Sequence, residues 1–186
     1  MTPAAGQHLI AAIPKTGDAE LGAVALVLGW LDFDGVDRAL GRLLAHGGVR
    51  RTVAEALTRR GPAAVDALLE ALLTDDDDVR KVAAMTLGRI GSPRALPSLV
   101  GLLDAESEVA IAAAGALGAI GDRQAFEPLL RLFDRAEPAV RQAAVSALNS
   151  IGHPGSAERI AALLQHLSPR VRDSAAKVAG YFGYSG

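Results

Sequence analysis

The chain has 186 residues, a formal net charge of −2 and a pI near 6.1. This balance excludes the strongly basic overall field with which proteins gather nucleic acid or an anionic membrane surface. The absence of cysteine excludes disulfides and thiolate metal sites. Hydrophobic residues make up 50% of the chain and aromatic residues only 4%. Because alanine and leucine dominate the apolar set, we predict an all-α protein of closely packed helices.

The first residues predict neither export nor a membrane anchor. They lack the basic start and long apolar run of a signal peptide. The most apolar window, Leu21 to Leu31, is well short of the ~20 residues that a membrane-spanning helix needs. We therefore expect a cytoplasmic protein without membrane contact. Residues 1–17, which contain two prolines and two glycines, are predicted to form an N-terminal tail.

Residues 18–48 predict a degenerate capping helix pair. An apolar helix begins at Asp18, and a second helix follows Asp34-Gly35 with its apolar residues on one face. A terminal unit of a repeat array is expected to be atypical, because one of its faces has no neighbour. Trp30 is predicted to be the large packing residue of this cap.

Residues 49–186 form an internal repeat in steps of 30 or 31 residues, and the last unit is incomplete. The first helix of each unit carries apolar residues at i, i+4 and i+8, which is the spacing of one helix face. A valine opens these helices at Val49, Val79, Val109, Val140 and Val171, and a glycine recurs at Gly61, Gly91, Gly121, Gly152 and Gly183. A small residue in the middle position, usually alanine, predicts close packing of adjacent first helices.

The second helix of each unit shows an i, i+3, i+4, i+7 apolar stripe, as in Leu96, Leu99, Val100 and Leu103. The predicted ends of the helices agree with this assignment. Gly91 and Gly121 suit left-handed C-caps, and Ser168-Pro169 suits a helix start.

The repeat carries a family resemblance. The stretch from Asp77 to Gly91, with its echoes over 108–121 and 139–152, resembles HEAT repeats of the phycobilisome-lyase-like type, whose period is short. The resemblance covers about residues 49–183 and implies an armadillo-like α-solenoid, an α-α superhelix of stacked helix pairs. It implies partner binding in general terms, since this family includes chromophore-lyase subunits and scaffold proteins. Ala110 departs from the pattern, because the other units have arginine there.

The sequence predicts no catalytic residue, no metal site and no cofactor. It contains no phosphate-binding glycine loop and no His-Glu-x-x-His motif, and the acidic run 75–78 lacks the turn glycine of a calcium loop. The four histidines are scattered and none precedes a glutamate, so a surface role is favoured over metal binding: His8, His46, His153 and His166.

Charged residues give the candidate binding surface. Acidic residues at the starts of first helices are explained by the helix dipole, but arginines at the starts of second helices oppose it. These arginines and their charged neighbours on the second helices, which line the concave face of such arrays, are the predicted partner-binding residues: Arg94, Arg123, Glu127, Arg131, Glu158 and Arg159.

These observations predict a non-catalytic scaffold or accessory subunit that binds a protein or peptide. The binding surface is predicted to comprise the concave face and the basic loop edge, which is formed by the arginines in the loops within the repeats. Clustered Lys and Arg are absent, so nucleic acid is not the expected partner. Three alternatives remain open: a chromophore-lyase-like accessory enzyme subunit, a DNA-binding HEAT-like protein, and a structural or engineered array without a natural ligand.

The C-terminal helix predicts a second surface. Tyr181, Phe182 and Tyr184 follow a first helix that no second helix covers. An exposed aromatic end is typical of an interaction site or of a missing piece. We expect either a longer array or a helix covered by another molecule, with end-to-end contact as one possibility.

Overall fold

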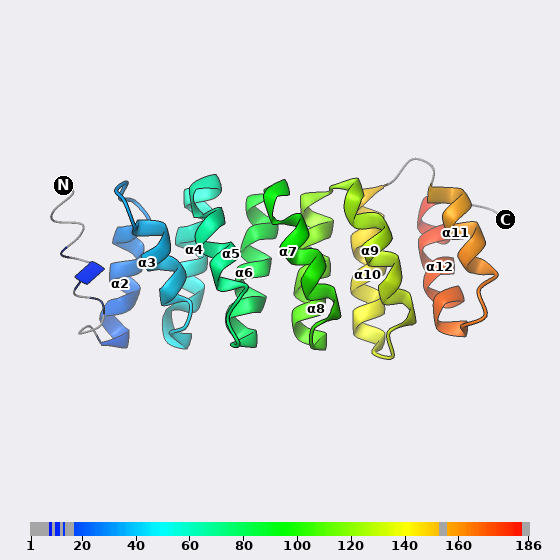
Figure 1. The fold of residues 1–186 in the computed structure, drawn as a ribbon, viewed down its shortest axis with the longest axis horizontal. Helices are drawn as coiled ribbons and strands as arrows, with labels where there is room; N and C mark the ends of the chain where they lie inside the picture. The colour runs from blue at the N-terminus through cyan, green and yellow to red at the C-terminus, as the bar shows by residue number, and fades with distance from the viewer. Residues whose placement is uncertain (1–7, 9, 12, 14–16, 153–155, 184–186) are drawn as a thin grey trace. The chain divides into compact units, whose positions relative to one another are not determined.

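The computed structural model describes residues 8, 10, 11, 13, 17–152 and 156–183, and this part of the chain contains helices and turns but no strand (Figure 1). The chain divides into two compact units, Met1–Ser92 and Pro93–Gly186. Unit 1 contains α2 (Asp18–Leu28), α3 (Val36–Leu43), α4 (Arg50–Arg60), α5 (Val65–Ala71) and α6 (Asp77–Ile90). Unit 2 contains α7 (Leu96–Gly101), α8 (Ser107–Ile120), α9 (Phe126–Leu130), α10 (Pro138–Ile151), α11 (Ser156–Leu164) and α12 (Pro169–Phe182).

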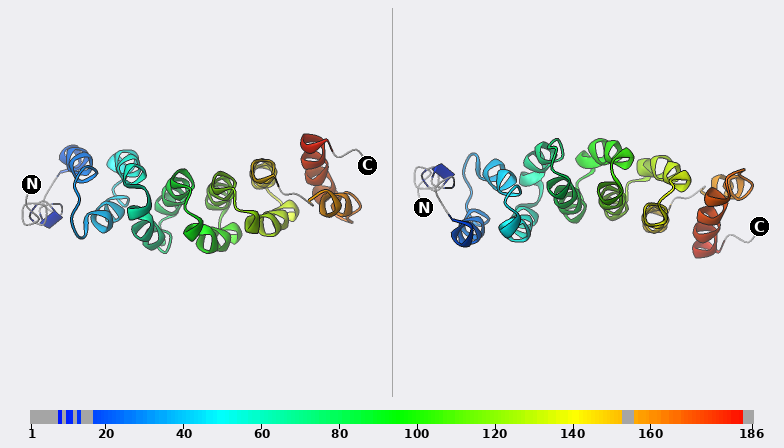
Figure 2. Two further views of the ribbon diagram at one scale, coloured as in Figure 1. Left: turned by 90° about the horizontal axis from the view of Figure 1, so that it is seen from above. Right: turned by 90° about the horizontal axis from the view of Figure 1, so that it is seen from below.

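Each unit is built as two rows of helices (Figure 2). In unit 1, α2, α4 and α6 pack in one row, and α3 and α5 form the other. In unit 2, α8, α10 and α12 pack in one row, and α7, α9 and α11 lie along one side of it. First helices therefore pack on first helices, which confirms the predicted α-solenoid of stacked helix pairs. The predicted N-terminal tail, residues 1–17, and capping helix pair, residues 18–48, stay a prediction. The structure divides the chain after Ser92, and this division does not test them.

The apolar stripes of the first helices form the core, as predicted. The five recurring valines are all buried, as are the residues four and eight positions after each of them. The middle residue of each stripe is alanine except Val53, and all five middle residues are fully buried. The hydrophobic effect stabilises each unit mainly through this stacking, since a single helix pair would leave half of its apolar surface in water.

Two glycines show how closely the first helices approach. A Cβ placed on Gly118 of α8 would lie only 2.8 Å from the Cα of Ala147 in α10. A Cβ on Gly29 would lie 2.9 Å from the Cβ of Ala56 in α4. Such distances are shorter than real Cβ contacts, so these positions require glycine. Gly180 occupies the position of α12 that corresponds to Gly118 and meets open space.

The predicted helix ends are largely confirmed. Gly91 and Gly121 end α6 and α8 with φ of 72° and 73°, in the left-handed region that glycine tolerates. Ser168 is the N-cap of α12 with Pro169 at the first position, although its side chain makes no capping hydrogen bond. At α6, the Oδ1 atom of Asp76 accepts hydrogen bonds from the amides of Asp78 and Val79. Part of the acidic run therefore has a structural role.

The prediction for Trp30 is wrong. Its side chain is 75% exposed, because the core positions of α2 are Leu21, Ala25 and Leu28, and Trp30 lies beyond the end of that helix. The guanidinium of Arg59 stacks over the indole ring, with its Cζ 4.6 Å from the ring centroid. Trp30 thus makes a surface cation–π contact and does not fill the cap.

Three of the four arginines at the second position of the repeats bind carbonyl oxygens of the preceding turn, whereas Arg80 pairs with Asp77. Arg50 donates from Nε to the Leu44 carbonyl at 2.8 Å. Arg141 and Arg172 each donate from Nη1 to two carbonyls five and six residues earlier, at 2.7–2.8 Å. These donors satisfy carbonyls in the turns that connect a second helix to the next first helix.

The unit with Ala110 in place of this arginine receives its guanidinium from elsewhere. Arg135, in the turn between α9 and α10, donates from Nη1 to the carbonyls of Leu103 at 3.2 Å and Ala105 at 3.4 Å. It also donates to Glu137 at 3.2 Å, which lowers the pKa of that carboxyl. The departure of Ala110 from the repeat pattern is therefore compensated by Arg135, near the end of the same repeat.

Changing Arg135 to alanine is expected to lower the free energy of unfolding by about 1–2 kcal/mol, because hydrogen bonds to partly buried carbonyls are lost. Urea unfolding followed by circular dichroism measures this change. Arg170→Ala, at an exposed position of α12, is the matched control and should change stability by no more than about 0.5 kcal/mol. Adding Ala110→Arg to Arg135→Ala should recover part of the loss. Equal stability of Arg135→Ala and the parent would contradict the assigned role.

Candidate functional site

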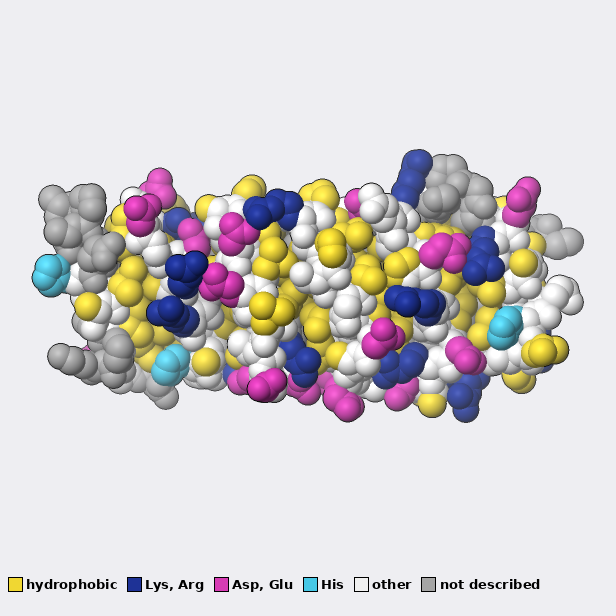
Figure 3. All heavy atoms as spheres, viewed as in Figure 1, with side chains coloured by type: hydrophobic (Ala, Val, Ile, Leu, Met, Phe, Trp, Pro, Cys, Tyr) yellow, Lys and Arg dark blue, Asp and Glu magenta, His cyan; other side chains and the backbone are white. Residues whose placement is uncertain are grey.

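Each unit has its own candidate site on the exposed sides of its second helices: α3 and α5 in unit 1, and α7, α9 and α11 in unit 2. Both are here called the second-helix surface. Within each unit, Figure 3 shows basic and acidic side chains beside one another with hydrophobic side chains between them. The mixture follows from the sequence, because each second helix directs its apolar stripe into the core and leaves short polar faces outside.

Neighbouring second helices are joined by ion pairs in both units. In unit 1, Arg38 of α3 donates to Glu70 of α5 from Nη2 at 3.1 Å and from Nε at 3.3 Å. The hydrogen bond with Glu70 raises the pKa of Arg38. In unit 2, Arg159 of α11 donates to Glu127 of α9 from Nε at 3.1 Å and from Nη2 at 3.2 Å. All four side chains are at least half exposed. The pairs therefore contribute little to stability and are accessible to a partner.

The structure brings together only two of the six predicted partner-binding residues, Glu127 and Arg159. Arg94 and Arg123 are exposed in short 3-10 turns that precede α7 and α9. Arg131 follows the end of α9, and Glu158 lies in the first turn of α11; both are exposed. All six residues belong to unit 2, where their side chains face solvent.

The predicted aromatic end is partly described. Tyr181 is 67% exposed at the end of α12. Its ring lies perpendicular to that of Phe182, with centroids 5.2 Å apart, and Phe182 is half-buried. Tyr184 lies outside the described residues. The ring of Tyr181 is therefore accessible at the end of α12.

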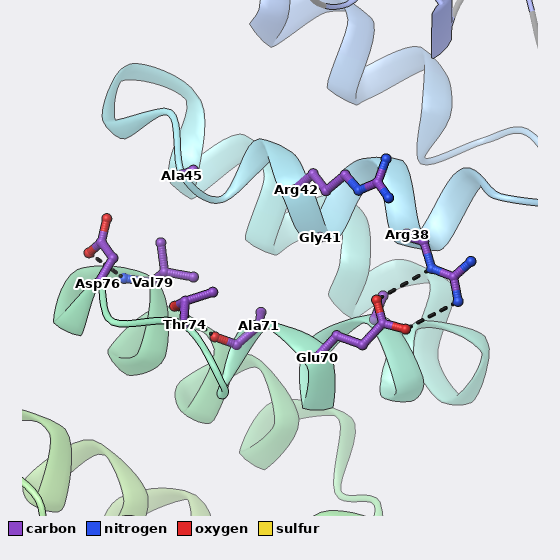
Figure 4. A pocket seen from close by; sticks show the side chains of 10 residues that line it. Arg38, Gly41, Arg42, Ala45, Glu70, Ala71, Thr74, Asp76 and Val79 are labelled. Atoms are coloured by element: carbon purple, nitrogen blue, oxygen red, sulfur yellow. Dashed lines mark hydrogen bonds and ion pairs between the residues drawn. The ribbon is translucent and has the colours of Figure 1, made fainter.

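Sequence reasoning missed a groove between α3 and α5 (Figure 4). The groove has a volume of about 360 Å³, and Val79 of α6 and Asp76, the N-cap of that helix, also line it. Its floor is apolar and consists of small residues, chiefly Ala67 and Ala71, which are buried, and Ala45.

Small side chains on facing helices create this groove. Gly41 of α3 lies so close to α5 that a Cβ there would be 3.2 Å from the Ala67 carbonyl oxygen. The backbones are therefore near one another, and no large side chain fills the space above the alanines. Gly41, Ala45, Ala67 and Ala71 stand at positions where larger residues are found in other second helices, such as Arg131. These four small residues, two pairs with a spacing of four, were the signal in the sequence that could have indicated the groove.

Among the described residues, no group of His, Asp and Glu side chains is arranged to hold a metal ion. His46 and His166 are exposed, and His166 accepts a hydrogen bond on Nδ1 from the Ser168 amide at 3.1 Å. His153 lies outside the described residues. None of the described helices is both long and apolar enough to cross a membrane.

Two overlapping stretches of the chain, residues 36–109 and 102–180, match the family described as HEAT repeats. The curated proteins contain no significant match to the sequence. Among solved structures, the chain is similar to the complex of CpcE and CpcF of phycocyanin lyase from Nostoc sp. PCC7120, with 23% identity and a TM-score of 0.62. That match covers 77% of this chain and 98% of the other.

The chain is also similar to a designed armadillo repeat protein in complex with the peptide (KR)4, with 20% identity and a TM-score of 0.59 over 94% of this chain and 98% of the other. An engineered protein shares 22% identity and a TM-score of 0.54 over 98% and 97% of the two chains. At these identities the likeness shows the fold alone. The family match and these structures confirm the predicted repeat type.

Proposed function

We propose that this chain, which belongs to the HEAT-repeat family, is a non-catalytic scaffold or accessory subunit that binds a protein or peptide partner. The observation that carries the proposal is the α3–α5 groove, whose apolar floor is bordered by charged side chains of both signs. Peptide-binding sites combine apolar pockets for some side chains with polar groups that fix orientation.

The charge distribution supports a protein partner over nucleic acid. A phosphate backbone selects clustered Lys and Arg, whereas the second-helix surface pairs Arg38 with Glu70 and Arg159 with Glu127. Two proteins of similar fold give further support by analogy. The designed armadillo protein is in complex with a peptide, and CpcE is in complex with CpcF.

Cross-linking mass spectrometry on partners captured from a host lysate tests the proposal. We expect cross-links between the partner and residues of the second-helix surface. Cross-links confined to the outer faces of α4, α8 and α10 would contradict it. A gel-shift assay near physiological salt should show no retardation of duplex DNA, and a clear shift would favour the DNA-binding alternative.

In unit 2 the partner is proposed to contact the six predicted residues. Changing Arg94, Arg123 and Arg159 together to serine should weaken binding of the captured partner at least tenfold, because three cations of the surface are lost. Thermal unfolding should be nearly unaltered, since exposed substitutions usually change stability by no more than about 0.5 kcal/mol each.

The matched control changes Arg51, Arg89 and Arg170 to serine. These three arginines are also exposed but lie on first helices, so the net charge changes equally while the second-helix surface is kept. Equal loss of binding in both triple variants would indicate a non-specific effect of charge. Unchanged binding in the variant of Arg94, Arg123 and Arg159 would show that these arginines do not contribute to the proposed interface.

The aromatic end of α12, Tyr181 and Phe182 with Tyr184 beyond the described residues, is proposed as a second contact surface, and a second copy of the chain is its first candidate partner. Sedimentation at tens of micromolar should show a dimer that is lost on changing Tyr181 and Phe182 to serine, because the exposed ring loses its apolar contact. Met85→Ser, at another exposed apolar position, should leave the dimer intact. A monomer whose α12 amides exchange as slowly as those of α8 would contradict the proposal.

A further inference from the structure

The acidic groups of the α3–α5 groove already have partners. Both carboxylate oxygens of Glu70 accept hydrogen bonds from Arg38. Asp76 uses Oδ1 to cap α6, and its Oδ2 lies 3.7 Å from Nη2 of Arg50. The hydroxyl of Thr74 donates to the Ala71 carbonyl at 3.1 Å. A cationic group entering the groove would therefore have to displace an existing interaction.

Arg42 is different. It lies one turn after Arg38 on α3, lines the same groove, and is exposed (Figure 4). In the part of the chain that the structure describes, its guanidinium makes no hydrogen bond or ion pair, so its five N–H donors are available. Arg42 lies in the last turn of α3, where the helix dipole favours a positive charge. This interaction with the dipole leaves the N–H donors of the guanidinium available for a ligand.

We propose that the groove is a subsite for a carboxylate side chain of the partner, which Arg42 binds while a neighbouring small apolar residue of the same peptide contacts the alanine floor. The guanidinium fork matches a carboxylate in a bidentate geometry. This inference rests on the proposed function and specifies the partner segment: an extended peptide with an Asp or Glu next to an apolar residue.

A singly charged carboxylate fits better than a phosphate group. The Glu70 carboxylate borders the same groove, and its repulsion of an anion grows with the charge of that anion. A C-terminal carboxylate has the same chemistry as an acidic side chain. The two sources are separated by the choice of peptides below.

The test is a titration of the full ¹⁵N-labelled chain with capped nine-residue peptides, followed by NMR. Three peptides share the same Ala and Leu residues and carry Glu, Gln or Lys at the central position; a fourth has central Gln and a free C-terminal carboxylate. At low salt the Glu peptide should bind about tenfold more tightly than the Gln peptide, as for a charge-assisted hydrogen bond. The largest shifts should occur at Gly41, Ala45 and Ala71.

Variants connect this preference to Arg42. Arg42→Gln should abolish the preference for Glu, and Arg42→Lys should keep only part of it, since lysine keeps the charge without the planar fork. Arg170→Gln, which removes an exposed arginine of α12 outside the second-helix surface, is the matched control and should leave the preference for Glu unchanged. Ala45→Phe should fill the groove and weaken binding of every peptide.

Four outcomes would overturn the inference: equal affinity for the Glu and Gln peptides, tighter binding of the Lys peptide, an unchanged preference in Arg42→Gln, or no shifts at millimolar peptide. Tighter binding of the fourth peptide than of the Glu peptide would overturn the assignment to a side chain. The proposed function fails separately, in the cross-linking experiment. If a captured partner is cross-linked to the second-helix surface but binds equally well to Arg42→Gln, the proposed protein binding is supported. Only the proposed carboxylate subsite is then contradicted.

Discussion

Replacing Leu117 by alanine is expected to lower the free energy of unfolding by roughly 2–5 kcal/mol. The Leu117 side chain is fully buried in α8, which packs against α7 and α10. The loss combines the transfer free energy of the removed carbons with a cavity that two neighbouring helices cannot close without moving. Urea unfolding, with hydrogen exchange of α8 and α10 as a local readout, measures the effect.

Leu167→Ala is the matched control for this change. It removes the same atoms from a side chain that is 94% exposed in the turn before α12, so the free energy of unfolding should change by no more than about 0.5 kcal/mol. A loss below about 1 kcal/mol in Leu117→Ala would mean that the stripe of the first helices is not the core.

Gly118→Ala and Gly115→Ala are expected to change stability in opposite directions, although both glycines lie in α8. A Cβ at Gly118 would meet the backbone of Ala147, so α8 and α10 would have to separate, at a cost of about 1–3 kcal/mol. A Cβ at Gly115 meets open space, and alanine there should raise stability by up to about 1 kcal/mol through helix propensity.

The two glycine variants control for one another, because the chemical change and the helix are the same. Thermal and urea unfolding of both proteins give the difference between them, and the near-identical helix content of the folded states can be checked by circular dichroism. If Gly118→Ala proved as stable as Gly115→Ala, the close approach of the first helices would not constrain this position.

The fold was predictable because it repeats. A buried valine at one position carries little information, but the same valine in five successive units, with a small or apolar residue four positions later, indicates a helix face and a packing partner together. Trp30 was misplaced because it occurs once, outside the regular units, where no second copy shows which side of the chain is buried. Its position depends on where α2 ends, and helix ends are less certain than helix faces.

The candidate site was less predictable than the fold. Charge pattern identified Glu127 and Arg159 as surface residues but could not show that they pair, because that contact depends on how α9 and α11 are staggered. The α3–α5 groove depends on the absence of side-chain atoms on two helices that are far apart in sequence. A run of glycine and alanine is also what close packing produces, so only the structure separates an open groove from a filled interface.

The hydrogen bonds of Arg135 affect where a repeat of this chain can be cut for transfer into another array. The turn before α8 belongs to the preceding repeat, but its carbonyls bind a guanidinium near the end of the repeat that contains α8, so the repeating segment of sequence and the self-sufficient piece of structure have different borders. A cassette of residues 107–137, one full repeat, would carry Ala110 and Arg135 without the carbonyls of Leu103 and Ala105 that Arg135 binds. A cassette that begins at Leu103 and ends after Arg135 would carry both the carbonyl acceptors and their donor. Chimeras cut at these two borders should therefore differ in stability although they contain the same helix pair.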